Sequence, residues 1–287
     1  MKRFVLKTIQ LIILICVIFI SYFLVCLLLL KPLNTDAIYI WGDSQTYQGL
    51  QLHILSEATQ CPVYSAAAHG GGMYDFLVFA NNVPTNSTCI IGFSEACLYR
   101  KINLDNNRSG VNITALNELY HSGYPWSEWI RIFRQNRGTP KHKFCTTHEM
   151  IAYADTICIS EPLDLWCNMF AREEAFHRNK QRAFLLGVEQ LHNKGCTLIF
   201  VSFPLHEWVE ECASSSINRK KTIELKLRLL DNYHIPEKTL ILESDSLLMH
   251  DLSHLNEIGA RITTKMLADS VLINKKDCFV SINLPKK

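Results

Sequence analysis

The sequence lacks any marked excess of one charge. Its 29 Lys and Arg residues against 27 Asp and Glu residues leave a formal net charge of +2. A balance so near neutrality gives no sign of a nucleic-acid partner or of an acidic one. The chain also lacks internal repeats and low-complexity tracts, so nothing indicates a repeat architecture. With 287 residues, it has room for one domain of roughly 200 residues and some additions.

A long apolar run near the N-terminus lacks the signals of cleavage. Residues 11–30 read LIILICVIFISYFLVCLLLL and are apolar apart from Ser21 and the hydroxyl of Tyr22. About 20 such residues cross a bilayer as a helix. The run ends LLLLKP, without the small residues of a cleavage site, and Cys26 lacks the small residue that precedes a lipidated cysteine. We therefore expect an uncleaved membrane anchor rather than a signal peptide.

Basic residues set the expected orientation of this anchor. Lys2, Arg3 and Lys7 precede the apolar run, and only Lys31 follows it closely. The positive-inside rule then predicts a cytoplasmic N-terminus and an extracytoplasmic domain, periplasmic or at the cell surface. The expected segments are a cytoplasmic N-terminus at 1–8, an anchor at 9–31 and a linker at 32–36.

The chain has eleven cysteines, which matter in an oxidising compartment. Cys16 and Cys26 lie in the apolar run, so nine remain outside it, and an odd number leaves at least one thiol free. Cys89, Cys158 and Cys196 stand in strand-like or apolar contexts, where cysteine is usually a small buried hydrophobe. The sequence assigns no pair.

One spacing is reminiscent of a metal site. His142, Cys145 and His148 follow the pattern H-x-x-C-x-x-H, but no convincing fourth ligand accompanies them. Structural zinc sites need four ligands. We therefore expect a polar surface loop here, and neither a metal nor another cofactor.

Beyond the linker, short apolar runs alternate with helical patterns. Such alternation of near-continuous apolar strands with helices predicts an α/β fold with a mostly parallel sheet. Gly195 follows one helical pattern as a C-cap would. The expected strands are 37–41, 61–67, 87–93, 196–204 and 238–244; the expected helices are 47–59, 172–194, one with Ile223, Leu227 and Leu230 on its apolar face, and 256–272.

Residues 98–170 break this rhythm, although the domain as a whole is expected to span 37–275 before a tail at 276–287. The interval is too long for a bare connection. We expect an inserted, aromatic-rich helical subdomain over the strand ends; alternatively, its aromatic side chains only form a small core of their own. These side chains are Tyr120, Tyr124, Trp126, Trp129 and Trp166.

Polar residues follow several of the expected strands. Ser44 comes after the first, the glycines at 70–72 after the second and Ser94 after the third, while Asp251 and His254 come after the last. In a parallel α/β sheet, ligands bind outside the carboxyl ends of the strands. We therefore expect these residues to form one site.

Asp251 and His254 have the spacing D-x-x-H directly before a helix. This spacing allows the carboxylate to bind the imidazole Nδ1, which leaves Nε2 free as a base. Such a base is what a serine hydroxyl needs to become a nucleophile, and Ser44 is the candidate. Two alternatives stay open: Ser44 or Asp43 only caps a helix, or His250 is the base.

The two end motifs, IWGDSQTY and HDLSHLNEIG, resemble those of the SGNH (GDSL-type) hydrolase superfamily. The resemblance covers residues 37–272 without the insertion. It implies a flavodoxin-like three-layer α/β/α sandwich. It further implies Ser44 as the nucleophile, His254 as the general base and Asp251 as the orienting carboxylate, and it favours His254 over His250.

The interior motifs depart from the family. Ser65 stands where the family has an asparagine, and Gly70 where it has an oxyanion-hole glycine; the third block, G-x-N-D, is GFSE here. The implied oxyanion hole consists of Ser44, Gly70 and Ser94. A serine hydroxyl is shorter and less preorganised than an asparagine amide, and Glu95 would oppose negative charge if it pointed inward.

Three functions follow from these residues. The first is a membrane-anchored esterase that removes O-acyl groups from a carbohydrate or cell-envelope polymer. The second is an O-acyltransferase acting on a surface polysaccharide, and the third is a catalytically inactive domain used for binding or assembly. His69, Trp126 and Trp129 are candidates for substrate contact, although a histidine in such a loop is more often one with ordinary partners than a substrate contact.

Overall fold

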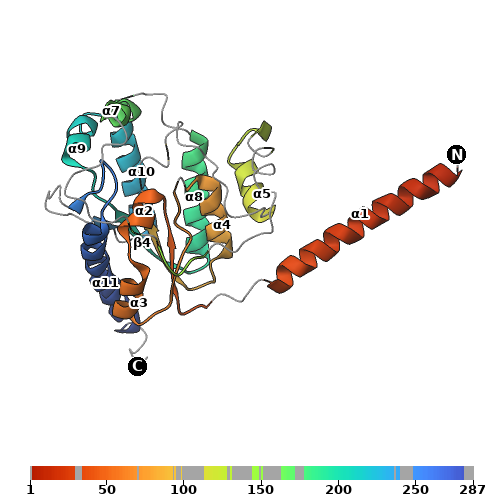
Figure 1. The fold of residues 1–287 in the computed structure, drawn as a ribbon, viewed down its shortest axis with the longest axis horizontal. Coiled ribbons are helices and arrows are strands. Elements are labelled where there is room, and N and C mark those ends of the chain that lie inside the picture. The colour runs from red at the N-terminus through yellow and green to blue at the C-terminus, as the bar shows by residue number, and fades with distance from the viewer. Residues whose placement is uncertain are drawn as a thin grey trace. The chain divides into compact units, whose positions relative to one another are not determined.

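A computed structural model describes most of the chain, and Figure 1 shows its elements. The chain divides into two compact units, Met1–Asn34 and Thr35–Lys287. The residues described are 2–29, 34–69, 71–92, 94, 98, 113–127, 130, 144–148, 150, 163–171, 178–235, 237–239 and 248–280.

The first unit contains one helix, α1 (Lys2–Leu29). Its described apolar side chains are exposed, for example Phe19 at 71% and Ile20 at 60%. Among the described side chains, no helix combines the length and the hydropathy that a membrane crossing requires. The anchor therefore stays a prediction.

A five-stranded sheet forms the centre of the second unit, in the order β2-β1-β3-β4-β5. Every pairing is parallel; Ile40, for instance, lies opposite Ser65 on one side and Ile90 on the other. This strand order is that of flavodoxin-like doubly wound folds. The predicted α/β fold with a parallel sheet is confirmed. The strands are β1 (Ile38–Trp41), β2 (Val63–Ser65), β3 (Thr88–Gly92), β4 (Thr197–Ser202) and β5 (Glu237–Thr239).

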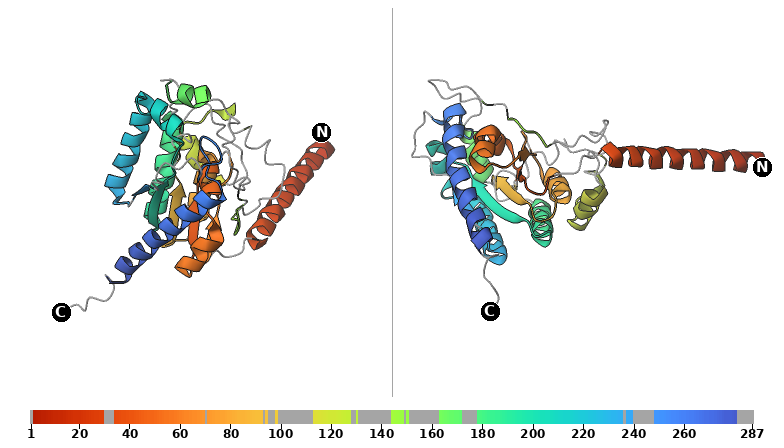
Figure 2. Two further views of the ribbon diagram at one scale, coloured as in Figure 1. Left: turned by 60° about the vertical axis from the view of Figure 1, so that its left-hand side comes forward. Right: turned by 90° about the horizontal axis from the view of Figure 1, so that it is seen from below.

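One face of the sheet is covered by α3 (Leu52–Thr59) and α11 (Glu257–Val280). Ile38 and Ile40 of β1 point to this side and share a buried cluster with Leu55 of α3 and Leu267 of α11. Figures 1 and 2 show both helices on the same side of the strands. Helix α11 continues well past the predicted end at 272, into the predicted tail.

The opposite face carries α4 (Met73–Asn82) and α8 (Arg178–Asn193). Here a chain of aromatic rings links strands to helices: Trp41 contacts Phe76 of α4 at 4.5 Å between centroids. Phe76 contacts Phe184 of α8 at 5.2 Å, and Phe184 contacts Phe200 of β4 at 5.9 Å. Because successive residues of a strand point to opposite faces, both faces of β1 are buried and the unit has three layers.

The helix predicted at 47–59 is wrong in one respect, because it is two helices, α2 (Ser44–Gly49) and α3. The backbone is extended at Leu50, with φ −128° and ψ 129°. Two threonines of α11 compensate for the break: Thr263 Oγ1 donates to Gly49 O at 2.8 Å, and Thr264 Oγ1 accepts from Gln51 N at 2.9 Å. These side chains satisfy groups that an unbroken helix would satisfy internally.

Helix α10 (Ile217–Tyr233) exists as predicted, but its buried face does not. Leu227, predicted to face the core, is 53% exposed, whereas Leu225 and Leu229 are 2% exposed. Lys226 belongs to the buried face because its Nζ donates to Ser202 Oγ of β4 at 3.0 Å. A lysine with an apolar stem and a paired head can occupy such a position, and periodicity alone does not reveal it.

Two described helices of the predicted insertion pack against different parts of the sandwich. Helix α5 (Ile113–His121) contacts α4 and α8, while α7 (Leu163–Ala171) contacts α9 (Glu207–Ala213) and α10. Figures 1 and 2 show α5 beside α4 and α7 beside α9. A disulfide between Cys167 and Cys212 joins α7 to α9.

Candidate active site

Ser44 is the first residue of α2, directly beyond the carboxyl end of β1. The residue that caps α2 is Asp43, whose side chain accepts from Gln45 N at 3.0 Å and whose carbonyl accepts from Tyr47 N at 2.9 Å. An aspartate in this position satisfies N–H groups that the first helical turn leaves open. The cap in this motif is therefore Asp43, and the hydroxyl of Ser44 is available to another partner.

Two glycines allow α2 to lie tightly on the strand ends. A Cβ at Gly42, after β1, would overlap the side chain of Thr46, and so would a Cβ at Gly92, at the end of β3. Thr46 is fully buried between them. Only glycine permits such a close approach. Gly42 of the GDS motif and Gly92 of the GFSE motif thus have the same structural role. Both leave room for Thr46, so that the helix of Ser44 can pack against the sheet.

Ser44, His254 and Asp251 form a continuous hydrogen-bonded set. His254 Nε2 lies 2.8 Å from Ser44 Oγ, and His254 Nδ1 lies 2.8 Å from Asp251 Oδ2. An ionised carboxylate only accepts hydrogen bonds, so Nδ1 carries the proton and donates to Asp251. The lone pair of Nε2 then accepts from the hydroxyl of Ser44. This is the arrangement in which a base can take the proton of a nucleophile.

The carboxylate of Asp251 is held in its charged form. Burial raises the pKa of Asp251, but the hydrogen bond and the charge of His254, together with the N–H groups of Ser253 and His254, outweigh it and lower the pKa below its usual value. Both N–H groups donate to Oδ1 at 2.8 Å. The carboxylate is thus ionised at neutral pH, where it orients the imidazole.

Asp251 and His254 lie in a turn that we call the histidine turn (residues 248–256). Asn256 ends it by capping α11: its Oδ1 accepts from Ile258 N and Gly259 N, both at 3.0 Å. A Cβ at Gly259 would overlap the carbonyl oxygen of Leu248. Asn256 N also donates to this oxygen, at 3.0 Å. Within the sequence LNEIG, Asn256 and Gly259 therefore hold the histidine turn close to the start of α11.

Two glutamines tie the segment that carries Ser44 to the histidine turn and to the first residue of α11. Gln45 Nε2 donates to Ser253 O at 3.0 Å, and Gln51 Nε2 donates to Glu257 O at 2.9 Å. These bonds fix the distance between the segments that carry Ser44 and His254. Sequence reasoning missed both glutamines, because an amide that binds a distant carbonyl leaves no signal in residue spacing.

His250, the alternative base, does not reach Ser44. Its backbone N–H donates to His254 O at 2.8 Å, and its Nδ1 is buried without a partner among the described residues. The structure brings His254, not His250, to the serine.

The predicted oxyanion donors are described only in part. Ser94, just beyond β3, is 8% exposed. Gly70 and Glu95 lie outside the described residues. The loop after β2 lies beside the serine, because Ala68 N donates to Gly42 O at 3.2 Å. The N–H of Ser44 opens α2, and the first N–H groups of a helix have no acceptor inside it.

The three predicted substrate contacts are placed differently. His69 is exposed, and its ring lies 4.9 Å from that of Tyr47, one turn after Ser44 in α2. Trp126 is 70% exposed. Trp129 lies outside the described residues. Of the three, His69 is the one placed beside the helix of the nucleophile.

The ring of Tyr47 also contacts that of His148, at 4.6 Å between ring centroids. Burial lowers the pKa of His148 to about 4, although its bond to the Leu50 carbonyl acts in the opposite direction. His148 Nδ1 donates to Leu50 O at 2.9 Å. Sequence reasoning did not connect His148 with the site.

In the described part of the H-x-x-C-x-x-H segment, predicted to be a polar surface loop, Thr146 and Thr147 are exposed, whereas Cys145 and His148 are half-buried. Cys145 pairs with Ser65 of β2 through two backbone hydrogen bonds of 2.8 and 2.9 Å, which draws the segment against the sheet. Within the described chain, no group of three potential metal ligands occurs. His142 lies outside the described residues, and the absence of a metal stays a prediction.

The fold and the site together define a class: a parallel α/β sandwich with a Ser–His–Asp set at the carboxyl ends of its strands. No protein-family model and no curated protein matches the chain. A similar solved structure is a GDSL-like lipase from Bacteroides thetaiotaomicron, at 12% identity and a TM-score of 0.39 over 88% of this chain and 97% of that one.

Two further solved structures are similar to this chain. The lipase/acylhydrolase from Enterococcus faecalis has 9% identity and a TM-score of 0.41, over 83% of this chain and 96% of that one. The M. smegmatis aryl esterase has 11% identity and a TM-score of 0.38, over 82% and 98%.

Proposed function

We propose that the protein is an SGNH-type serine esterase that cleaves O-acyl esters through an acyl-Ser44 intermediate. The observation that carries the proposal is the set of distances of 2.8 Å from His254 Nε2 to Ser44 Oγ and 2.8 Å from His254 Nδ1 to Asp251 Oδ2. A hydroxyl, a base and an orienting carboxylate within hydrogen-bond reach are the groups that acyl transfer requires.

In the first half of the reaction, His254 Nε2 takes the proton of Ser44 while Oγ bonds to the acyl carbon. The electron pair of the carbonyl moves to its oxygen, where the Ser44 N–H, Ser94 and Gly70 are the proposed donors. Removing one such donor typically costs about a hundred- to a thousandfold in rate. The oxyanion then collapses, the bond to the leaving alcohol breaks, and His254 gives its proton to the alcohol oxygen.

In the second half, a water molecule replaces the alcohol. His254 Nε2 takes a proton from the water as its oxygen attacks the acyl carbon, and the bond to Ser44 Oγ breaks. The proton returns to Ser44, and the acid is released. In both halves the charge of Asp251 stabilises the imidazolium that forms on His254.

We further propose an O-acylated carbohydrate or cell-envelope polymer as substrate, outside the cytoplasm, with α1 as the anchor. The apolar run at 11–30 and the basic residues before it support the anchor. The disulfide Cys167–Cys212 supports an oxidising compartment, because disulfides are rare in the cytosol. The exposed rings of His69 and Trp126 support a polymer that offers sugar faces.

The test uses the full-length chain in mild detergent, a short acyl ester of p-nitrophenol and a fluorophosphonate probe. We expect hydrolysis and covalent labelling at Ser44, both lost in Ser44→Ala. Ser56→Ala is the matched control, since Ser56 lies on α3, where its hydroxyl bonds the Cys61 carbonyl at 2.7 Å. A folded wild-type chain that neither hydrolyses the ester nor accepts the probe would overturn the proposal.

The same assay separates the esterase from the acyltransferase. With an acylated donor and an oligosaccharide acceptor, an esterase releases the free acid at a rate that the acceptor does not change. Transfer of the acyl group to the sugar, detected by mass spectrometry, would replace the hydrolase assignment with the transferase.

A further inference from the structure

Leu252 lies within the histidine turn, between Asp251 and His254 in the sequence. It is 2% exposed and packs with Val209 and Ala213 of α9, both fully buried. Partly buried Leu163, Trp166 and Leu205 surround these three residues. We call this group the α9 cluster. Leu252, one of the two residues between Asp251 and His254, is thus anchored in a cluster separate from the core of the sheet.

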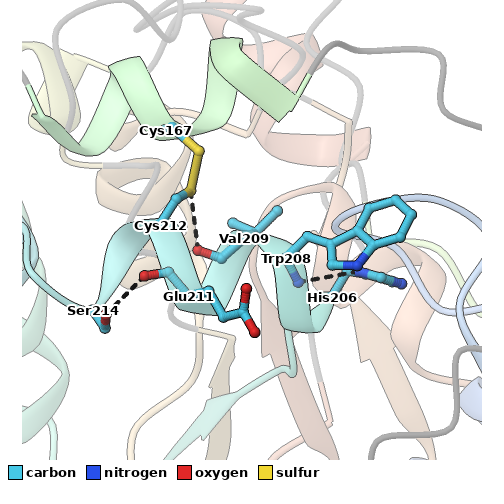
Figure 3. The surroundings of a disulfide bond; sticks show 7 residues. All are labelled: Cys167, His206, Trp208, Val209, Glu211, Cys212 and Ser214. Carbon is cyan, nitrogen blue, oxygen red and sulfur yellow. Dashed lines mark hydrogen bonds between the residues drawn. A yellow bond between two sulfur atoms is a disulfide. The ribbon is translucent and has the colours of Figure 1, made fainter.

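The backbone of Leu252 is bound to the same segment. His206 N donates to Leu252 O at 3.0 Å. His206 is 3% exposed and caps α9, its Nδ1 accepting from Trp208 N at 3.3 Å. Figure 3 shows this cap at one end of α9 and the disulfide at the other. Both the side chain and the carbonyl of Leu252 therefore depend on the position of α9.

Helix α9 needs support from outside. It has 7 residues, and helices this short are not stable by themselves. In its last turn, Cys212 is bonded to Cys167 of α7, with a Cα–Cα distance of 5.4 Å. Glu210 binds Arg219 of α10 through two hydrogen bonds of 2.5 and 2.9 Å. A cluster with three fully buried residues is small, and small cores rely on covalent links.

We infer that the disulfide Cys167–Cys212, acting through α9 and Leu252, positions Asp251 and His254 for the chemistry of Ser44. The inference rests on the proposed function. With the disulfide intact, α9 holds Leu252 from both its side chain and its carbonyl, and the imidazole faces the serine. Without it, α9 loosens and the histidine turn samples positions in which Nε2 no longer faces Ser44 Oγ.

The expected signature is a loss in turnover without a loss in binding. In Cys167→Ser/Cys212→Ser, we expect kcat to fall roughly ten- to a hundredfold, because a displacement of about 1 Å at reacting groups can cost that much. KM changes less than about twofold, since a buried leucine and a disulfide behind the turn do not touch substrate. Cys61→Ser, at a cysteine outside this disulfide, is the matched control and leaves both constants unchanged.

Reduction provides a second route to the same state. Treatment of the full-length wild type with a dithiol reductant converts the disulfide to two thiols as the reductant is oxidised. We expect it to lower kcat as the double variant does, and to leave the double variant itself unaffected. A wild-type kcat that is unchanged after complete reduction, shown by alkylation of Cys167 and Cys212, would overturn the inference.

Leu252 gives a test that does not depend on the cysteines. Leu252→Ala retains the disulfide but removes the anchor, so kcat falls with KM unchanged, whereas Leu252→Met keeps the volume and restores most of kcat. If the double cysteine variant fails to fold, this pair decides the question. Equal kcat values in folded Leu252→Ala and wild type would contradict the inference.

A spectroscopic readout separates this inference from the proposed function. The Nδ1 proton that His254 shares with Asp251 gives a far-downfield proton resonance in wild type. We expect it to broaden or vanish in Leu252→Ala and after reduction. If the wild type hydrolyses no ester, the proposed function fails, but the resonance still tests whether the disulfide and Leu252 position His254. A resonance that is unchanged both in Leu252→Ala and in the reduced wild type would contradict the inference.

Discussion

The two ends of the candidate site are supported in different ways. Ser44 stands on a helix packed directly on the strand ends, where the glycines at 42 and 92 enclose the buried Thr46. His254 lies in a turn whose Leu252 is anchored in the α9 cluster. The position of Ser44 is thus set by direct packing on the sheet. The position of His254 depends on the small α9 cluster, which a disulfide links to α7. Changes that loosen the α9 cluster should therefore displace His254 before they displace Ser44.

The largest effect is expected where the two ends meet. Ser44→Ala and His254→Ala should each lower kcat by about four to six orders of magnitude, and the double variant should be no worse than either single one. Groups that act as one unit lose their effect together. Ester hydrolysis by the three variants, with Ser56→Ala as control, checks this. Losses that multiply in the double variant would mean that the two ends act separately.

Removing the disulfide should be the largest change in stability. For a sequence separation of 45 residues, the chain-entropy model predicts a loss of about 4 kcal/mol in Cys167→Ser/Cys212→Ser. Urea unfolding of the full-length chain, followed by tryptophan fluorescence, measures it. In this variant, ester hydrolysis should be lost at a lower urea concentration than the midpoint of the main change in fluorescence. Coincident loss of both would show that the base end is as stable as the sheet.

Acid should weaken the support of α2, the helix that carries Ser44, because His148 contacts Tyr47 of this helix and donates to the carbonyl of Leu50, which follows it. The pKa of His148 is lowered to about 4 by burial, against about 6.5 in an unfolded chain. The unfolded state therefore binds more protons between these values. The stabilisation is complete above about pH 6.5 and is lost as the pH falls through about 4, a change of at most about 3 kcal/mol.

His148→Gln should remove most of this pH dependence, because an amide is neutral and can still donate to Leu50 O. His53→Gln, on an exposed position of α3, is the matched control. The carboxylate of Asp251 has a lowered pKa, so its contribution persists down to its ordinary value of about 3.9 and is lost only below it. An unchanged slope of unfolding free energy between pH 4 and 6.5 in His148→Gln would contradict the assignment.

The smallest effect is expected at the nucleophile end itself. Gly42→Ala places a methyl group against Thr46, and overpacking of this kind costs about 1 to 3 kcal/mol. Thr46→Ala removes the hydroxyl oxygen Oγ1, the atom nearest to the added Cβ, and should relieve part of the loss, so the two changes should not add. Urea unfolding of the single and double variants measures the coupling. Additive losses would show that the close approach does not hold α2.

Periodicity and motif position predicted much of this site. The parallel sheet followed from apolar runs alternating with helical patterns, and Ser44, Asp251 and His254 followed from their places after strands. The break after Gly49 could not be predicted, because the groups that satisfy it come from Thr263 and Thr264. The local pattern of apolar residues carries no information about hydrogen-bond partners that lie more than 200 residues further along the chain.

Helix α10 shows the same limit at the level of packing. Its apolar pattern predicted a face around Leu227, but the face that packs includes Lys226, whose ammonium finds Ser202. Hydrophobicity ranks a lysine as exposed, and only the neighbouring strand makes its burial favourable.

The sequence by itself determined the order of strands and helices and the kinds of side chain that follow each strand. In a parallel sheet all carboxyl ends lie at one edge, so chain order alone gathers these residues. Tertiary structure decided the rest: that Asp43 is the cap, that His254 rather than His250 meets Ser44, and that Cys167 and Cys212 brace the turn. These depend on distances between atoms far apart in the chain, which only the packed structure sets.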